Sequence, residues 1–212
     1  MKSFFTRTAM LVVCSLALVC SAHAQAIFDS LGGATVGADS VYEYGPLGAS
    51  FTTPSTPFTL GDVDVLLGTI YYPEGATDVA LYSDSETSPG TELAYLGTVP
   101  DVDLSYSEPY LENFNFPLST PLPLAPDTRY WIVLSTDPEA EITVAGWAYT
   151  YNTSGLGVAG EYYYGDGGTY SNSDGPYQME IFGAPEPGTA GLLILGLGSL
   201  GFLGISRRKL LN

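Results

Sequence analysis

The middle of the chain alternates between short apolar stretches and clusters of turn-forming residues. Val, Ile, Leu, Tyr and Trp dominate the apolar stretches at 62–72, 78–84, 92–99, 111–116, 129–135 and 141–151. Pro, Gly, Ser, Thr and Asp fill the clusters at 52–57, 72–78, 86–92, 119–128, 152–157 and 165–176. Short strands separated in this way are typical of an antiparallel β-sandwich or jelly roll. We therefore predict an all-β body, with no helix outside the two ends of the chain.

Two local patterns add detail to this prediction. Ser88–Thr91 (SPGT) fits a type II turn with Gly90 at the third position, where φ is positive. The stretch 129–134 is apolar enough for a central strand, and Trp131 within it is expected in the core. Residues 25–37 are expected to be loosely ordered.

The first 24 residues have the parts of a secretory signal peptide. Lys2 and Arg7 precede an apolar stretch at 9–19, and Ala22-His23-Ala24 fits the small-x-small cleavage pattern. One alternative is a retained N-terminal membrane helix, but the stretch is only about half of a span. Another is a lipoprotein signal at Cys20, which lacks the small residue that such processing needs. We predict cleavage after Ala24 and export of the chain.

The end of the chain combines a Pro-Glu-Pro step, an apolar run and a basic cluster. Gly188–Ser206 is uncharged and about 28 Å long as a helix, close to the hydrocarbon thickness of a bilayer. A buried core helix is the alternative, but it explains neither the missing polar face nor the stop at Arg207, Arg208 and Lys209. Positive charge after a span keeps that end in the cytoplasm. We predict a signal peptide at 1–24, an extracellular β-sandwich at 25–184 and a C-terminal segment with a transmembrane helix at 185–212.

The charge distribution restricts the function more than the net charge of −17 does. All 23 acidic residues lie between Asp29 and Glu186, where Arg129 is the only cation. Such a body is repelled by nucleic acid and by anionic lipid, so nucleic-acid binding is excluded. Removing the signal peptide removes both cysteines and the only histidine, and with them Ser-His-Asp and Cys-His catalysis and a zinc site of His and Cys. We expect no enzymatic activity and no cofactor.

Paired carboxylates are the first candidates for chemistry. Asp62 and Asp64 sit two residues apart, as do Asp101 and Asp103, which on a strand places both members of a pair on one face. Such pairs can run glycoside hydrolysis when one member is buried and the other stays ionised. A solvated outer face of an acidic protein is the interpretation that we favour.

Calcium is a second candidate. Asp166, Asn172 and Asp174, set among glycines, offer the oxygen ligands that Ca²⁺ prefers. The spacing does not match an EF-hand and lacks the closing Glu, so we favour a polar turn and leave metal binding open. Asn152-Thr153-Ser154 has the pattern of an N-glycosylation site, which we interpret as a turn.

Aromatic residues are the third candidate. Trp147, Tyr149 and Tyr151 alternate along one predicted strand and so share a face. Together with Tyr162–Tyr164 they offer a flat surface for stacking on neutral sugars. The alternative is that tyrosine is simply a good strand residue that covers the edges of sheets.

Pro185, Glu186 and Pro187, the Gly/Leu-rich run and then Arg207 and Arg208 resemble the PEP-CTERM sorting signal of bacterial exported proteins. The resemblance implies recognition by an exosortase, a membrane-embedded transpeptidase-like enzyme. It also implies removal of the tail and transfer of the body to the cell surface or the extracellular matrix. Bacteria with such systems usually make exopolysaccharide.

The body has a second resemblance. GASFTT, FTLGDVDVLL, DVALYSDSETSPGTELAYLGTV and PLPLAPDTRYWIVLS follow one another between residues 48 and 135. This series is similar to the choice-of-anchor R domains, which are exported modules attached to varied surface anchors. The resemblance implies a β-sandwich and supplies no catalytic residues.

These observations predict an exported protein with a structural or adhesive role. We expect it to be held in the inner membrane by its C-terminal helix, processed, and then found at the cell surface or in the matrix, associated with exopolysaccharide. One alternative is a module that binds neutral carbohydrate, which requires an exposed Trp/Tyr cluster. The other is a carboxylate-dependent hydrolase, which requires two inward-facing carboxylates about 5–9.5 Å apart in a cleft.

Overall fold

The computed structural model describes residues 26–69, 74–86, 88–105, 110–139, 142–151, 162–165, 168–170 and 175–184. These residues belong to one compact unit, Gln25–Ala184, which has the bounds of the predicted exported domain. The predicted cleavage site at Ala22 and Ala24 and the predicted membrane run at 188–206 lie outside the described residues. No helix among the residues described has the length and apolar content that crossing a bilayer requires.

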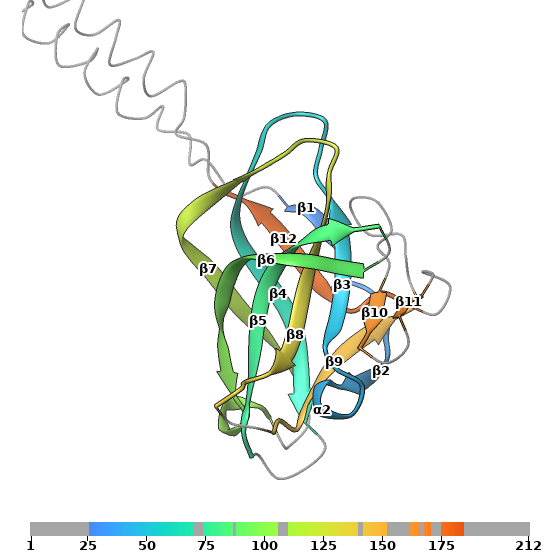
Figure 1. Cartoon of the computed structure of the whole chain (residues 1–212). Helices are drawn as coiled ribbons and strands as arrows, with labels where there is room; N and C mark the ends of the chain where they lie inside the picture. The colour runs from blue at the N-terminus through green and yellow to red at the C-terminus, as the bar shows by residue number, and fades with distance from the viewer. Residues whose placement is uncertain are drawn as a thin grey trace, which may run out of the picture. The chain divides into compact units, whose positions relative to one another are not determined.

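In the described part of the chain, two antiparallel sheets of six strands form the fold (Figure 1). Sheet A contains β1 (Ala26–Asp29), β2 (Thr35–Ser40), β4 (Phe58–Thr69), β7 (Leu111–Leu124), β9 (Ala145–Thr150) and β12 (Met179–Gly183). Sheet B contains β3 (Leu47–Thr52), β5 (Ala76–Ser85), β6 (Ser88–Pro100), β8 (Arg129–Thr136), β10 (Tyr162–Tyr164) and β11 (Gly168–Tyr170). The predicted all-β antiparallel sandwich is confirmed.

The order of the strands follows from the pairing of a few long ones. In sheet A, β4 pairs with β7 along one side and with β12 and then β9 along the other. β1 continues the sheet beyond β12, and β2 continues it beyond β9. In sheet B the order is β11-β10-β3-β8-β5-β6. β8 therefore lies in the middle of sheet B, as the apolar stretch at 129–134 predicts.

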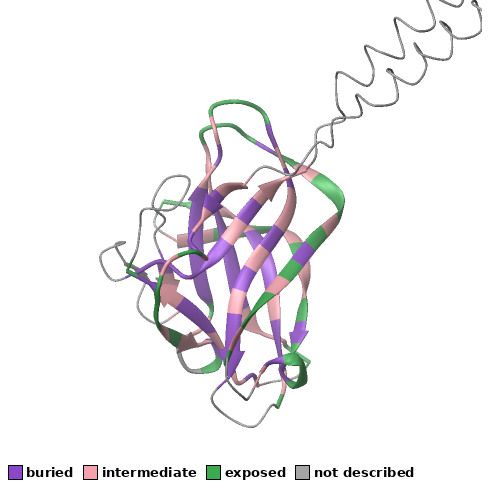
Figure 2. Ribbon diagram, turned by 180° about the vertical axis from the view of Figure 1, so that it is seen from behind, coloured by how far each residue is buried: buried purple, intermediate pink, exposed green. Residues whose placement is uncertain are grey.

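Strand β4 shows how a bulge keeps one face of a long strand in the core. Phe58 and Leu60 are buried, and so are Val63, Val65 and Leu67. The step from Leu60 to Val63 breaks the two-residue alternation, and the pairing with β7 and with β12 shifts at the same place. Because side chains alternate across a strand, the extra residue returns the second half to the core side. Figure 2 shows the resulting alternation of buried and intermediate residues along the strands.

An aromatic stack joins the two sheets through the core. Trp147 of β9 and Tyr177 lie face to face, with ring centroids 4.7 Å apart, and Tyr162 of β10 meets Tyr177 edge-on at 5.7 Å. The Trp147 indole N–H donates to the carbonyl of Gln178 at 3.0 Å, which satisfies the polar end of this buried ring. Each ring is at least 95% buried, so the stack is part of the main core.

The start of the body is ordered, and the expectation of a loose segment at 25–37 is wrong. β1 and the first half of β2 lie within it. Between them, the buried amide of Gln178 donates to the carbonyls of Ser30, Leu31 and Gly33 and accepts from the Thr35 hydroxyl. One buried side chain thus supplies the partners that this loop needs, which its own sequence does not reveal.

The hairpin between β5 and β6 turns earlier than predicted. Ser85 pairs with Ser88, so the turn contains Glu86 and residue 87, and Glu86 has the positive φ, at 61°. Pro89 and Gly90, which we expected in a type II turn, lie in β6, and Gly90 does not have positive φ. Left-handed backbone at the first turn position, which Glu86 has, matches the twist of the flanking strands, and this geometry prevails over the Pro-Gly signal.

Strand β7 also runs further than predicted, through the proline-rich cluster expected to be a turn. Pro117 and Pro123 pair with β4 on one side only, and sheet A has no further strand beyond β7 in the described part of the chain. Proline, which has no N–H to donate, is tolerated on such an edge. Two short helical segments complete the described elements: α2 (Val41–Tyr44) and the 3₁₀ turn η1 (Asp101–Asp103).

The first and last strands of the body are neighbours. Ala26 pairs with Phe182, and β12 lies between β1 and β4 within sheet A. Directly after β12, the Ala184 N–H donates to the Thr59 carbonyl at 2.8 Å. A Cβ on Gly61 would stand 2.6 Å from the Ala184 Cα, so the bulge in β4 requires glycine where the end of the body crosses it.

Candidate functional site

The β5–β6 hairpin folds over the outer face of sheet B and covers a tryptophan there. Trp131 alternates with Tyr130 and Ile132, which belong to the main core, so it points away from that core. It nevertheless has no exposed surface. Pro89 of the hairpin, Trp131 and Tyr163 all come within 3.5 Å of a Cβ built on Gly48, and Figure 1 shows β6 crossing in front of β3 and β8. Burial of Trp131 is confirmed, but in a separate outer layer.

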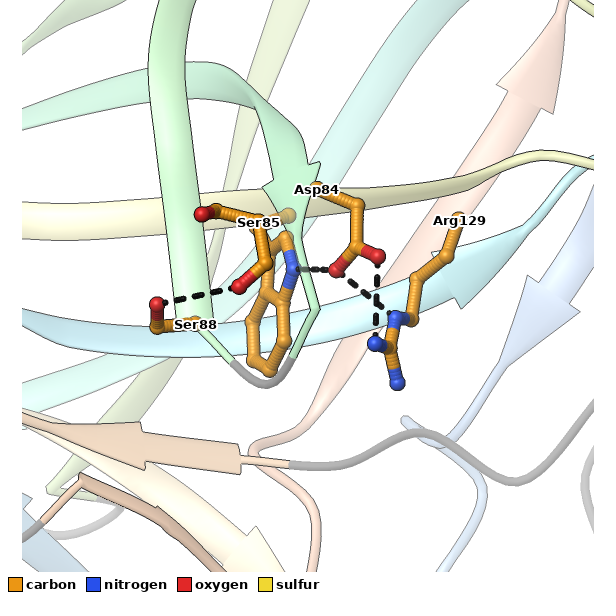
Figure 3. A network of polar contacts seen from close by, with 5 residues as sticks. Asp84, Ser85, Ser88 and Arg129 are labelled. Carbon is orange, nitrogen blue, oxygen red and sulfur yellow. Dashed lines mark hydrogen bonds and ion pairs between the residues drawn. The ribbon is translucent and has the colours of Figure 1, made fainter.

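Asp84, Arg129 and Trp131 meet in what we call the Asp84 node. The Arg129 Nε donates to Asp84 Oδ1 at 2.8 Å and its Nη2 donates to Oδ2 at 3.1 Å (Figure 3). The Trp131 Nε1 donates to the same Oδ1 at 2.8 Å, and the guanidinium carbon lies 5.7 Å from the indole centroid. A bidentate pair fixes the orientation as well as the distance of the two groups. The only cation of the predicted exported domain is therefore engaged in holding the hairpin.

The indole bond contributes more to this node than the ion pair does. Both charged side chains are 26% exposed, so their pairing is worth at most about 1 kcal/mol. Leaving the buried Trp131 N–H without an acceptor would cost about 1–3 kcal/mol. The sequence contains both halves of the node. Leu-Tyr-Ser-Asp at 81–84 supplies the carboxylate, and Thr-Arg-Tyr-Trp at 128–131 supplies the two donors. The pairing of β5 with β8 brings them together.

Next to the node, tyrosine and carboxylate side chains share the outer face of β5 and β6. Asp78 pairs with Thr98, Ala80 with Tyr95 and Tyr82 with Glu92, while Val79 and Leu81 between them face the core. The β5–β6 outer array is the set of these six residues: Asp78, Ala80, Tyr82, Glu92, Tyr95 and Thr98. Sequence reasoning missed this array because its members are far apart along the chain and belong to strands with bulges.

Hydrogen bonds fix both tyrosines of the array. The Tyr82 hydroxyl donates to Glu92 Oε2 at 3.3 Å, and the Tyr95 hydroxyl donates to Asp78 Oδ1 at 3.1 Å and contacts the Thr98 hydroxyl. Thr98 donates to the same Asp78 oxygen at 2.6 Å. Desolvation and the charge of Glu92 raise the pKa of Tyr82. The Thr98 bond lowers the pKa of Tyr95, but desolvation and Asp78 outweigh it, so both phenols stay protonated donors.

Asp62 and Asp64 share the outer face of sheet A, as their spacing predicts. The Asn115 side-chain amide donates to both, at 2.8 Å and 2.6 Å. Burial raises the pKa of Asp64, the Asn115 bond lowers it and the charge of Asp62 raises it. Glu180 pairs with Asp64 from β12, and burial together with the charges of Asp29 and Asp64 raises its pKa. This is a half-buried polar face in which one amide bridges two carboxylates.

Asp101 and Asp103 do not share a strand face, and the prediction for this pair is wrong. Both lie in η1, where Asp101 has no exposed surface and Asp103 is exposed. The Asp101 carboxylate accepts from the Thr143 hydroxyl and from the Val144 N–H, each at 2.7 Å. Burial raises its pKa, and the two hydrogen bonds lower it. Asp101 joins η1 to the segment before β9 and has no access to a substrate.

The predicted aromatic surface on β9 is not formed. Trp147 is fully buried, and Tyr149 packs partly against the core from the same side. The shared face is therefore the inner one. Tyr151 follows the strand and is 60% exposed, with its ring centroid 6.2 Å from that of Tyr149. Tyr162 is buried in the aromatic stack and is likewise unavailable for a flat outer surface.

Several predicted sites lie outside the described residues. These are Asp166, Asn172 and Asp174 of the calcium candidate and the turn at Asn152–Ser154. The same holds for Pro185, Glu186 and Pro187 and for the basic cluster at 207–209. Among the residues that the structure does describe, no three His, Cys, Asp or Glu side chains are grouped to hold a metal ion.

Comparison with known proteins bears on the end of the chain. Residues 184–209 match the PEP-CTERM protein-sorting motif. The motif supports export through exosortase-type sorting, with an exosortase-type processing enzyme as partner and membrane-associated processing before the surface is reached. The match begins at Ala184, the residue whose N–H is bonded to β4. The chain has no match among curated proteins or solved structures.

Proposed function

We propose that this chain is an exported protein whose body is passed to the cell surface or the extracellular matrix, where it has a structural or adhesive role without catalysis. The sorting motif at 184–209 carries the proposal, because it supplies the route and the processing enzyme. A signal peptide cleaved after Ala24 starts the export. A helix at 188–206 holds the chain in the membrane until the exosortase-type enzyme acts. Exopolysaccharide is the surrounding material with which the body associates.

The use of the carboxylates supports a role without catalysis. Glycoside hydrolysis needs one protonated and one ionised carboxyl group on either side of a bond. Asp101 has no exposed surface and accepts two hydrogen bonds from the protein itself. Asp62 and Asp64 are held side by side on one amide of the outer face. Asp62, Asp64 and Asp101 thus each have a structural use, and Asp103 is a lone exposed carboxylate.

Intact mass and location in the native host test the sorting route. The wild type is compared with a variant in which Pro185, Glu186 and Pro187 are replaced by alanine. A second variant with Ser55→Ala and Thr56→Ala, in an exposed loop before β4, controls for general effects of substitution. We expect the wild type and the control to begin at Gln25, to end near Pro187 and to lie outside the inner membrane. The sorting variant should keep its tail and stay in the inner membrane.

A different result in the wild type would overturn the proposal. If the wild-type protein keeps Arg207–Asn212 and stays in the inner membrane, the tail is an ordinary anchor. The protein would then be a membrane-tethered domain that faces outward, and no exosortase would take part.

A further inference from the structure

We propose that the β5–β6 outer array binds a neutral polysaccharide. The inference gives a ligand class to the adhesive role proposed above and rests on that role, but the array is defined by the sandwich alone. Its two aromatic rings, its hydroxyl groups and its carboxylates stand on one face of two paired strands. β6 pairs only with β5 among the described strands of sheet B, so one side of the array is the open edge of the sheet.

The tyrosines supply the surface on which sugar rings stack. Tyr95 is 56% exposed, and Tyr82 lies on the neighbouring strand, one pair further along. Such diagonal neighbours stand about 7–8 Å apart, with the alanine at position 80 between them in the register. The apolar C–H face of a pyranose packs on the face of an aromatic ring, whose polar end stays hydrated. In this arrangement, each of the two rings stacks on one of two successive sugars of a polysaccharide chain.

The polar members of the array supply hydrogen bonds to sugar hydroxyls. Asp78 and Glu92 already bond the two phenols, and each carboxylate has further lone pairs to accept from a sugar. A hydrogen bond to an ionised acceptor is stronger than one between neutral groups. Because each ring is tied at its hydroxyl, binding costs less side-chain freedom than it would for free tyrosines.

Charge decides which polysaccharide fits. The two carboxylates of the array belong to a body whose only cation, Arg129, is bound in the Asp84 node. A polyuronate or a sulfated polymer would meet like charge on every side. A neutral chain meets none, and its hydroxyls are donors to the carboxylates. The array therefore selects a neutral polymer over an anionic one.

The Asp84 node keeps the array in place. The β5 and β6 strands continue from the array into the hairpin that covers Trp131, only two residues beyond Tyr82. Asp84 holds the hairpin to β8 through Arg129 and Trp131. The twist of the two strands, and with it the angle between the tyrosine rings, is thus fixed at one end.

Affinity electrophoresis tests the proposal with hydroxyethyl cellulose as the neutral probe and polygalacturonate as the anionic one. The full chain is purified in a polyoxyethylene detergent, which carries no sugar headgroup. We expect hydroxyethyl cellulose to retard the wild type and polygalacturonate to leave it unaffected. Tyr95→Ala should lower the affinity about fivefold, since one stacked ring contributes on the order of 1 kcal/mol. Tyr95→Phe should keep most of it.

The matched control is Tyr110→Ala, which removes a tyrosine 48% exposed outside the array. It should bind as the wild type does, and thermal melting confirms that each variant is folded. The proposal is overturned if the neutral polymer does not retard the wild type, if polygalacturonate retards it equally, or if Tyr95→Ala binds like Tyr110→Ala. The binding measurements use purified protein and the sorting experiment uses the native host. Either proposal can therefore be overturned while the other stands.

Discussion

Replacing Asp101 by alanine is expected to destabilise the body by about 2 kcal/mol at neutral pH. The partly buried Val144 N–H loses the Asp101 carboxylate oxygen that accepts from it at 2.7 Å. An unsatisfied buried donor costs about 1–3 kcal/mol. The Thr143 hydroxyl also loses a bond, but it lies 2.7 Å from the Thr77 hydroxyl and can turn to that partner. Removing a buried charge offsets part of the loss, because burial raises the pKa of Asp101.

Asp101→Asn is the matched control for this experiment. An asparagine amide can accept from Val144 with its oxygen and donate to Thr143 with its nitrogen, so the number of hydrogen bonds is kept. Thermal unfolding followed by tryptophan fluorescence measures both variants, because Trp131 and Trp147 are fully buried in the folded chain. For a body of this size the alanine variant should melt about 4–8 °C below the wild type. The reasoning is refuted if the alanine variant is as stable as the wild type, or if both variants lose the same amount.

Three further predictions follow from the same contacts. Burial raises the pKa of three carboxyl groups of the body, so the folded state binds protons more tightly than the unfolded one. Their contribution is full below the unfolded pKa values of 3.8 to 4.5 and is lost as pH rises through the folded ones. The melting temperature should therefore rise as the pH is lowered from neutral toward those unfolded values, and a flat profile would contradict this. Asp84→Ala should make Trp131 accessible to acrylamide quenching, while Asp103→Ala, at an exposed carboxylate, should not; equal quenching would show that the node does not hold the hairpin. Gly61→Ala should lower the melting temperature by several degrees, because its Cβ meets backbone at 2.6 Å, whereas Gly32→Ala has open space and should be neutral.

The fold class follows from the sequence because strand periodicity is local. β5 and β8 are continuous apolar stretches bounded by turn residues, and both form where the pattern places them. β1 and β12 were missed because each is short and gains its stability from a partner at the other end of the chain. The extension of β7 through its prolines depends on its place at an edge, which is a property of the whole sheet.

The candidate site depends on tertiary information of a different kind. Alternation correctly puts Trp147 and Tyr149 on one face, but it does not say which face is the inner one. Asp101 is buried because it lies in a 3₁₀ turn, and the spacing of acidic residues along the sequence does not predict this burial. Tyr82 and Tyr95 become neighbours only through the pairing of β5 with β6, whose register shifts at three places. The sequence therefore shows which residue types could form a site, but it does not show which of them the fold brings together.

The place of β12 between β1 and β4 fixes the order of events during export. A chain that crosses the membrane amino terminus first releases β1 early and β12 last, so sheet A lacks an interior strand until the residues just before the sorting motif have crossed. Pairing between such distant segments is slow, because the entropy of closing the long loop is lost before any stabilising contact forms. In a chain that crosses in this direction, the body completes its fold only once translocation has nearly ended. A chain that stalls before Gly183 presents an incomplete sheet, with the open edge of β4 exposed to proteases and to other chains.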